Sequence, residues 1–311
     1  MNELAKPRIA VLLPCYNEEA AIARTVEGFR KVLPEAVIYV FDNNSKDRTV
    51  EEAQKAGAQV RTETMQGKGH VVRRMFADVD ADVYIMADGD LTYDPASAPV
   101  MVKALTDGRL DMVVGTRHHE EKQAYRGGHV FGNRLFTGLL SRLFGRSFTD
   151  IFSGYRAFSR RFVKSFPALS SGFEIETEMS VHALELKMPV GEVPTVYGAR
   201  PEGSASKLST LSDGWRILKT IATLYRVERP VLFYGVIGLL YLLVAVILAV
   251  PLLFTYLETG LVPRFPTAIL ATGLVIIAVL CFFAGVILDT VTRGRREMRR
   301  LAYLSQPGPS R

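Results

Sequence analysis

Cysteine, histidine and tryptophan are scarce in this chain, and their scarcity limits the chemistry it can carry. The two cysteines, Cys15 and Cys281, lie far apart in the sequence, so we expect neither a disulfide framework nor a thiolate metal site. A reducing compartment is the simpler interpretation of this cysteine usage. No convincing metal-ligand spacing is found for His70, His118, His119 and His182.

A strong charge excess and an apolar N-terminus are also missing. The 38 Lys and Arg against 32 Asp and Glu give a net charge of +6, which is too mild to indicate nucleic-acid binding. No zinc-finger or RNA-binding signature is present, so we expect no nucleic-acid partner. A mild positive charge suits a surface that faces anionic lipid or phosphate. Residues 1–8 have no apolar core, so we do not expect a secretory signal peptide.

Long uncharged apolar runs occur only near the end of the chain. Residues 231–257 and 265–288 contain no charged side chain. Each run exceeds the roughly 20 residues that a helix needs to cross a bilayer. The sequence therefore predicts two transmembrane helices, at about 231–257 and 265–290, within a membrane region of residues 230–292.

Arginine is concentrated on the outer sides of these two runs. The link between them is short, so the two helices form a hairpin whose outer ends lie on the same side of the membrane. The positive-inside rule then places the N-terminal domain, residues 1–229, and a basic tail at 293–311 in the cytoplasm. For a bacterial-looking chain the membrane expected is the plasma (inner) membrane. The link contains only Arg264, whereas the flanking arginines are Arg226, Arg229, Arg293, Arg295, Arg296, Arg299 and Arg300.

Short apolar segments alternate with amphipathic segments in the first part of the chain. Such alternation predicts an α/β fold with a doubly wound, mostly parallel sheet. The predicted strands are 8–16, 37–41, 59–62, 83–87, 112–115 and 190–197. The predicted helices include 17–32, 48–56, 94–106 and 174–186.

The apolar strand at 83–87 ends abruptly in Asp88-Gly89-Asp90. Ligands of open α/β sheets bind beyond the carboxyl ends of the strands. Two carboxylates at such an edge suit a hard divalent cation, which in turn suits a diphosphate. An ordinary Asp-Gly-Asp turn is the alternative.

Polar side chains also follow the other predicted strands. Residues 14–18 lie where the first strand runs into its loop, Asp42 follows the second strand and Arg117 the fifth, while Lys68 lies in a glycine-rich loop near the third. Parallel topology brings these positions to one edge of the sheet, together with the acidic pair. The context therefore favours a metal and diphosphate site over a simple turn.

Two further segments, at about 130–148 and 210–226, have one apolar face and one face with basic and polar residues. Basic amphipathic helices lie in membrane interfaces. Packing against the sheet is the alternative, especially for the first segment. The second runs directly into the first apolar span, which favours an interfacial position.

An ordered set of motifs runs through the chain. Its segments are Pro14-Cys15-Tyr16-Asn17-Glu18, residues 42–49, Gln66-Gly67-Lys68-Gly69, Asp88-Gly89-Asp90, Asp150 with residues 153–158, and Ser206-Lys207-Leu208. This set resembles the family 2 glycosyltransferases. Within that family it is similar to the polyprenyl-phosphate glycosyltransferases, which include dolichol-phosphate mannose synthases and bacterial undecaprenyl-phosphate glucosyltransferases. The resemblance covers roughly residues 8–229 and implies the GT-A nucleotide-diphospho-sugar transferase fold, with interface helices before the spans.

The resemblance also implies roles for individual residues. Asp88 and Asp90 match the acidic pair that holds Mg²⁺ or Mn²⁺, and together with Arg117 they form the expected catalytic set. Nucleotide contacts are expected from Pro14, Tyr16, Glu18, Asp42, Asn44, Lys68 and Asp88. Acceptor-phosphate contacts are expected from Arg117, Arg126, His129, Arg156 and Lys207.

Two of these positions carry alternatives, and one nearby residue departs from the family pattern. Lys68 is also compatible with a solvated lysine at a helix start, and Arg156 with a structural ion pair. Thr92 stands where some relatives have a glutamine that helps to hold the metal.

The predicted function is an inverting transfer of a sugar from a nucleoside diphosphate sugar to polyprenyl phosphate. A UDP-sugar is favoured and GDP-mannose remains open. The divalent cation would neutralise the leaving diphosphate. The lipid monophosphate is already ionised, so no strong general base is needed.

Two alternatives remain. One is a same-fold membrane glycosyltransferase with another acceptor, such as a diacylglycerol or a polysaccharide, and the other is a non-catalytic membrane partner that retains the fold. A processive synthase is disfavoured because Trp215, the one tryptophan, lacks a Gln-x-x-Arg-Trp context. Two spans make a small membrane domain, which association into a homo-oligomer would enlarge.

Overall fold

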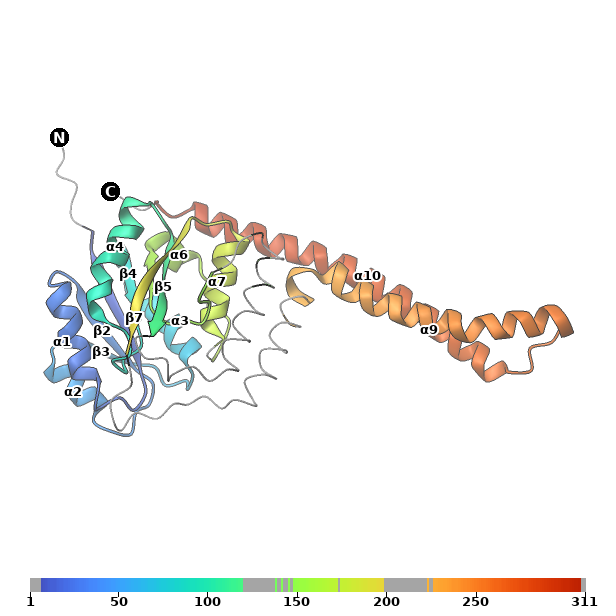
Figure 1. The fold of residues 1–311 in the computed structure, drawn as a ribbon, viewed down its shortest axis with the longest axis horizontal. Coiled ribbons are helices and arrows are strands. Elements are labelled where there is room, and N and C mark those ends of the chain that lie inside the picture. Colours follow the sequence, from blue (N-terminus) through green and yellow to red (C-terminus); the bar gives the residue numbers. More distant parts are fainter. Residues whose placement is uncertain are drawn as a thin grey trace. The chain divides into compact units, whose positions relative to one another are not determined.

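A seven-stranded sheet forms the centre of the first part of the chain in this computed structural model (Figure 1). The structure describes residues 7–119, 148–172, 174–198 and 226–308, with a few isolated positions between them. The strand order is β3-β2-β1-β4-β6-β5-β7. The strands are β1 Ile9–Cys15, β2 Val37–Asp42, β3 Gln59–Thr62, β4 Val83–Met86, β5 Met112–His119, β6 Arg156–Ser159 and β7 Val190–Tyr197.

The sheet is mostly parallel, as the alternating pattern predicts. β1 pairs in parallel with β2 and β4, β2 with β3, and β5 with β7. The exception is β6, which the sequence does not predict and which runs antiparallel between β4 and β5. Because β6 reverses direction, its first residue lies at the edge where β4 and β5 end. The loop that leads into β6 is thereby delivered to the carboxyl edge of the sheet.

Helices cover both faces of the sheet (Figure 1). The side with α1, α2 and α4 buries alternate residues of β1, including Val11 and Leu13, against Phe29 and Met101. The side with α3, α6 and α7 contains an aromatic cluster in which Phe76 packs edge-on against Phe158, with ring centroids 5.6 Å apart. The helices are α1 Ile22–Val32, α2 Thr49–Lys55, α3 Lys68–Asp78, α4 Ala98–Asp107, α6 Arg160–Ser165 and α7 Ile175–Glu185, with a 3₁₀ turn, η1, at Pro95–Ser97.

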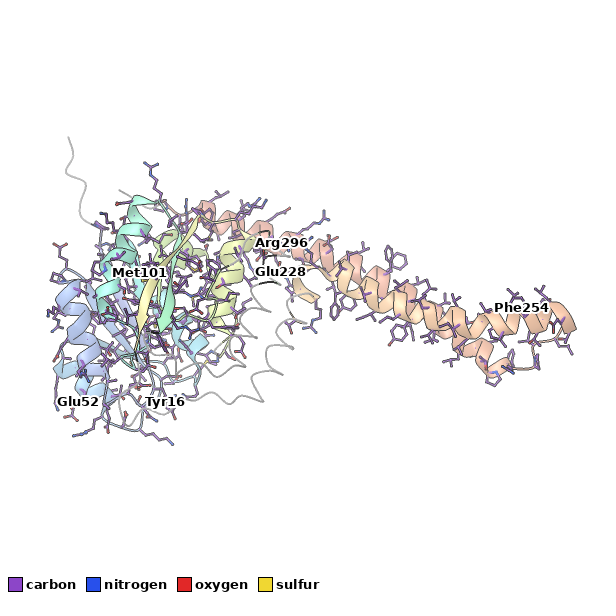
Figure 2. All side chains as sticks on the ribbon, in the orientation of Figure 1. Tyr16, Glu52, Met101, Glu228, Phe254 and Arg296 are labelled. Carbon is purple, nitrogen blue, oxygen red and sulfur yellow. The ribbon has the colours of Figure 1, made fainter. Side chains whose placement is uncertain are left out.

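Two long helices form a separate compact unit that spans residues 215–298. They are α9 Pro230–Thr259 and α10 Phe265–Leu304, and both are long and apolar enough to cross a membrane. Only 11% and 17% of their most apolar stretches are buried, so the apolar surface is outward-facing. Phe254 is an example, at 62% exposed (Figure 2). These helices contain the predicted spans.

Small residues and one ion pair join the two helices. A Cβ at Gly238 would lie 3.0 Å from the carbonyl oxygen of Ala278, so glycine permits close helix packing there. Before α9, the Glu228 carboxylate accepts a hydrogen bond from Arg296 Nη2 at 2.6 Å (Figure 2).

α10 continues through most of the segment predicted as a basic tail and ends at Leu304. Residues from Arg299 onward belong to the same compact unit as the sheet. There, Tyr303 Oη donates to Asp111 at 2.8 Å, and the Arg161 guanidinium lies 4.3 Å from the Tyr303 ring centroid. Arg299 also forms a 2.5 Å ion pair with Glu185 of α7. The basic residues here thus contact the sheet unit itself.

The two amphipathic segments predicted at 130–148 and 210–226 lie almost entirely outside the described residues, and their membrane-interface position stays a prediction.

Candidate active site at the carboxyl edge of the sheet

Asp90 is fixed by the turn that follows β4. Thr92 donates to Asp90 Oδ1 from both its hydroxyl, at 2.6 Å, and its backbone N–H, at 3.2 Å. Leu91, between them, has a φ of +60°, a conformation that a branched side chain seldom adopts. Such strain is retained when the surrounding structure over-determines it, and it is commonest at functional sites. Thr92 therefore acts as a support for Asp90.

Asp88 forms an ion pair with Lys68 at the start of α3. Lys68 Nζ lies 2.5 Å from Asp88 Oδ1 and 2.6 Å from Glu176 Oε1 of α7. Burial opposes the ammonium charge, but the two carboxylates outweigh burial and raise the pKa of Lys68. The alternative of a solvated lysine is wrong, because the Lys68 side chain is only 10% exposed.

Glu176 is a residue that the sequence does not reveal. Its side chain is 6% exposed, although it lies in a helix that the sequence presents as simply amphipathic. The only local signal is the density of acids in the first turns of that helix, which also suits the helix dipole. Nothing in this pattern indicates a partner on α3.

The loop that precedes β6 contributes Gly154 beside the same carboxylate. A Cβ at Gly154 would lie 3.0 Å from Asp88 Oδ2 and 3.2 Å from Lys68 Nζ. Glycine therefore keeps open the space next to the Asp88 oxygen that Lys68 does not contact. Tyr93 Oη fixes this loop by accepting a 2.8 Å hydrogen bond from Gly154 N.

Arg117 is held at the same edge by Asp150. It lies within β5, which extends to His119, and not after the strand as the sequence predicts. Its Nε and Nη2 donate to the two Asp150 oxygens at 2.7 and 2.8 Å, and its guanidinium lies 5.5 Å from the Tyr197 ring centroid. Burial opposes the charge, but hydrogen bonds to Asp150 raise the pKa of Arg117. The guanidinium therefore stays charged.

The loops after β1 and β2 are joined by reciprocal hydrogen bonds. Asn17 accepts from Lys46 N at 2.8 Å, while Asn17 N donates to Ser45 Oγ at 2.9 Å. Asn17 has a φ of +54°, which ends any helix at that point, and α1 consequently starts at Ile22 and not at residue 17. Asp42, only 4% exposed, accepts from Ser45 N at 3.2 Å.

The other predicted nucleotide contacts lie on these two loops. Pro14 is buried in β1, Tyr16 is half-buried at the loop (Figure 2), and Glu18 N donates to Thr49 Oγ1 at 2.8 Å. Asn44 has a φ of +63° and donates to Thr64 O at 2.8 Å. The structure thus brings these positions together beside one another, although their contact with a nucleotide stays a prediction.

Asn43 links the loop after β2 to the glycine-rich loop. The sequence does not predict this role of Asn43. It is 4% exposed, and its side chain donates to Glu63 O and Met65 O and accepts from Gly67 N at 2.7 Å. Gly67, at a φ of +135°, lies against the backbone oxygen of Ser171, where a side chain would collide. This packing places Lys68 at Asp88.

Comparison with known proteins shows a family match and a relative of similar length. The profile of the glycosyl transferase family 2 matches residues 10–166. Glycosyltransferase AglJ of Haloferax volcanii is 32% identical over 304 residues, which cover 95% of this chain and 98% of AglJ. The chain belongs to glycosyl transferase family 2.

Further relatives fit this family membership. A dolichyl-phosphate hexose transferase of H. volcanii is 28% identical over 229 residues, covering 74% of this chain and 99% of that protein. Among solved structures, glucosyl-3-phosphoglycerate synthase of Mycobacterium tuberculosis with Mn²⁺, UDP and glucosyl-3-phosphoglycerate has a TM-score of 0.58 at 23% identity, over 71% of this chain and 80% of that one. This likeness shows that the sheet unit has the GT-A fold.

A divalent cation fits the acidic pair of this family 2 enzyme fold. The carboxylates of Asp88 and Asp90 supply the hard oxygen ligands that Mg²⁺ and Mn²⁺ favour, and Gly154 leaves room beside Asp88. Among the described residues no group of three His, Cys, Asp or Glu side chains could hold a metal. Mg²⁺ commonly uses one or two carboxylates and takes its other ligands from substrate phosphates and water. Asp88 and Asp90 would therefore be sufficient protein ligands for such a cation.

One expected acceptor contact is corrected by the structure. Arg156 is completely buried and donates to Ser153 O, to Ile151 O and to Ser180 Oγ. Burial lowers the pKa of Arg156 to about 10. Arg156 therefore shapes the loop before β6, and its guanidinium does not reach a substrate phosphate. The other expected acceptor residues Arg126, His129 and Lys207 lie outside the described residues.

Proposed function

We propose that this protein transfers a hexose from a nucleoside diphosphate sugar to a polyprenyl phosphate, with inversion at the anomeric carbon. The observation that carries this proposal is that Asp88 and Asp90 follow β4 while the Asp150-bound Arg117 lies near the end of β5, at the same edge of a GT-A sheet. The resemblance of the motifs and the dolichyl-phosphate hexose transferase relative support a lipid phosphate as the acceptor.

Asp88 and Asp90 would hold Mg²⁺ or Mn²⁺, which neutralises the charge that develops on the leaving diphosphate. Lys68 pairs with Asp88 and adds a positive charge nearby. Asp150 occupies Nε and Nη2 of Arg117, and Arg117 Nη1 donates to no residue that the structure describes. That side of the guanidinium is the one we assign to a substrate phosphate.

Repulsion between the acceptor phosphate and the donor diphosphate is the main obstacle to this reaction. A fixed guanidinium reduces the repulsion without having to reorganise during the step. The acceptor monophosphate is an ionised nucleophile at neutral pH, so the site requires no strong base. We further propose that α9 and α10 span the plasma membrane as a hairpin and hold the site where a lipid phosphate reaches it, with both termini cytoplasmic.

A donor and acceptor panel tests this proposal. Purified full-length protein is incubated with undecaprenyl phosphate and UDP-glucose, UDP-N-acetylglucosamine or GDP-mannose, and products are followed by mass spectrometry. We expect one lipid-phosphate-linked hexose, lost in EDTA and in Asp90→Ala with folding preserved. Transfer only to a diacylglycerol or to 3-phosphoglycerate would show that the acceptor is not a polyprenyl phosphate. Full activity in EDTA would refute the metal role.

A further inference from the structure

Lys68 bridges two acids that come from different elements. Its ammonium lies 2.5 Å from Asp88, after β4, and 2.6 Å from Glu176, on α7. The Lys68 and Glu176 side chains are 10% and 6% exposed, whereas Asp88 is 29% exposed. The ion pair therefore has a buried end at Glu176 and a more open end at Asp88.

The open end coincides with the metal site proposed above. A divalent cation that binds Asp88 competes with the Lys68 ammonium for the charge of that carboxylate. If Asp88 were the only partner, the cation would leave a buried ammonium without a counter-charge, which is strongly unfavourable. Glu176 provides a second carboxylate at hydrogen-bonding distance, so the ammonium remains paired when Asp88 turns to a cation.

We propose that Glu176 is a positioning residue for metal binding: it retains the Lys68 ammonium and thereby frees Asp88 for the divalent cation. This inference rests on the proposed function, because it assumes that Asp88 and Asp90 hold the metal. Glu176 itself does not contact the metal or the substrate. Its effect passes through Lys68.

A buried ion pair that only stabilises the fold is the alternative. Removal of Glu176 would then lower stability without a specific effect on metal affinity. A general electrostatic effect is a second alternative, in which Glu176 attracts the cation through space. That effect would persist when Lys68 is absent, whereas coupling through Lys68 would disappear.

The experiment measures Mn²⁺ binding to the full-length protein by electron paramagnetic resonance of free Mn²⁺, both without nucleotide and with UDP. We expect Glu176→Gln to weaken Mn²⁺ binding roughly 10- to 100-fold, as loss of a supporting partner of a metal ligand does. Lys68→Met removes the competing ammonium, so it should bind Mn²⁺ at least as tightly as the wild type. In the Lys68→Met background, Glu176→Gln should have no further effect.

Glu185→Gln is the matched control. It removes a buried acid from the same helix, nine residues along the chain from Glu176, that pairs with Arg299, so Mn²⁺ affinity should stay at the wild-type value. Glu176→Asp is the second variant if Glu176→Gln does not fold. It keeps the charge but draws the carboxylate back, and an intermediate affinity is expected.

The outcomes separate this inference from the proposed function. Wild-type Mn²⁺ affinity in both folded Glu176 variants would overturn the inference alone. An equal loss of affinity from Glu176→Gln with and without Lys68 would also overturn it, in favour of a through-space effect. A wild-type protein that binds no Mn²⁺ under either condition would reject the metal role in the proposed function and, with it, this inference, while the donor and acceptor panel would still decide the transfer itself.

Discussion

Gly154→Ala probes the space beside Asp88 more directly than removal of a ligand does. The added Cβ would lie 3.0 Å from Asp88 Oδ2 and 3.2 Å from Lys68 Nζ. Both contacts are closer than an ordinary van der Waals distance, so the carboxylate must retreat by a few tenths of an ångström. Gly154 does not have a left-handed φ, so alanine causes no backbone strain there.

The expected effect falls on activity and not on folding. A misplacement of about 1 Å costs roughly 100-fold in rate, so a shift of a few tenths should lower kcat/KM about tenfold. Alanine makes the unfolded chain less flexible, which raises the free energy of unfolding by about 0.4–1 kcal/mol. This gain offsets part of the penalty from the close contacts. The free energy of unfolding should therefore change by less than about 1 kcal/mol.

The assay compares sugar transfer, Mn²⁺ affinity and urea unfolding of the Gly154→Ala variant with the wild type. Gly198→Ala is the control, because its Cβ would lie 3.9 Å from Thr92 O, an ordinary contact at the same edge of the sheet. Full activity together with unchanged Mn²⁺ affinity in Gly154→Ala would show that nothing binds beside Asp88 Oδ2.

Three other perturbations test separate parts of the structure. Thr92→Val removes the hydroxyl that donates to Asp90 at 2.6 Å, and Mn²⁺ titration should show roughly tenfold weaker binding, whereas Thr92→Ser should restore it. Tyr303→Phe removes the hydrogen bond to Asp111, and urea unfolding should show a loss of about 1–2 kcal/mol, since a buried carboxylate loses a partner. Burial lowers the pKa of His182 to about 3, so the unfolded chain takes up a proton first as the pH falls below about 6.5. Stability present above that pH is lost towards pH 3, and His182→Leu should flatten this dependence in unfolding measured at several pH values.

Each of these expectations has a contrary result. Equal Mn²⁺ affinity in Thr92→Val would mean that the turn alone holds Asp90. An unchanged unfolding midpoint in Tyr303→Phe would show that the docked end of α10 adds no stability. A His182→Leu protein with the pH dependence of the wild type would place the responsible group elsewhere.

The parallel part of the sheet could be predicted from the sequence because each strand is an apolar run between amphipathic helices. The strand β6 could not, since Arg156–Ser159 has four residues, and its fully buried arginine conceals the apolar pattern. The start of α1 at Ile22, five residues after the predicted start at residue 17, has a different cause. Asn17 and Glu18 suit a first helical turn, but tertiary bonds to Ser45 and Thr49 hold them in a loop.

The site was predictable where a residue acts at a strand end and unpredictable where it acts through a neighbour. Asp88 and Asp90 follow β4 and Asp42 is the last residue of β2, so topology alone brings them to one edge. Glu176 and Asn43 reach that edge only through the packing of α7 and of the glycine-rich loop. Short-range sequence patterns carry no information about such long-range pairs.

The contact of Tyr303 with Asp111 makes the sheet unit discontinuous along the chain. Residues 299–311 leave the ribosome after the two apolar helices, so the unit is completed only when the whole hairpin has been synthesised. Simple truncation before α9 would remove Arg299 and Tyr303 from their acidic partners. A water-soluble form of the enzyme is therefore better made by replacing residues 215–298 with a flexible linker that keeps both ends of the unit.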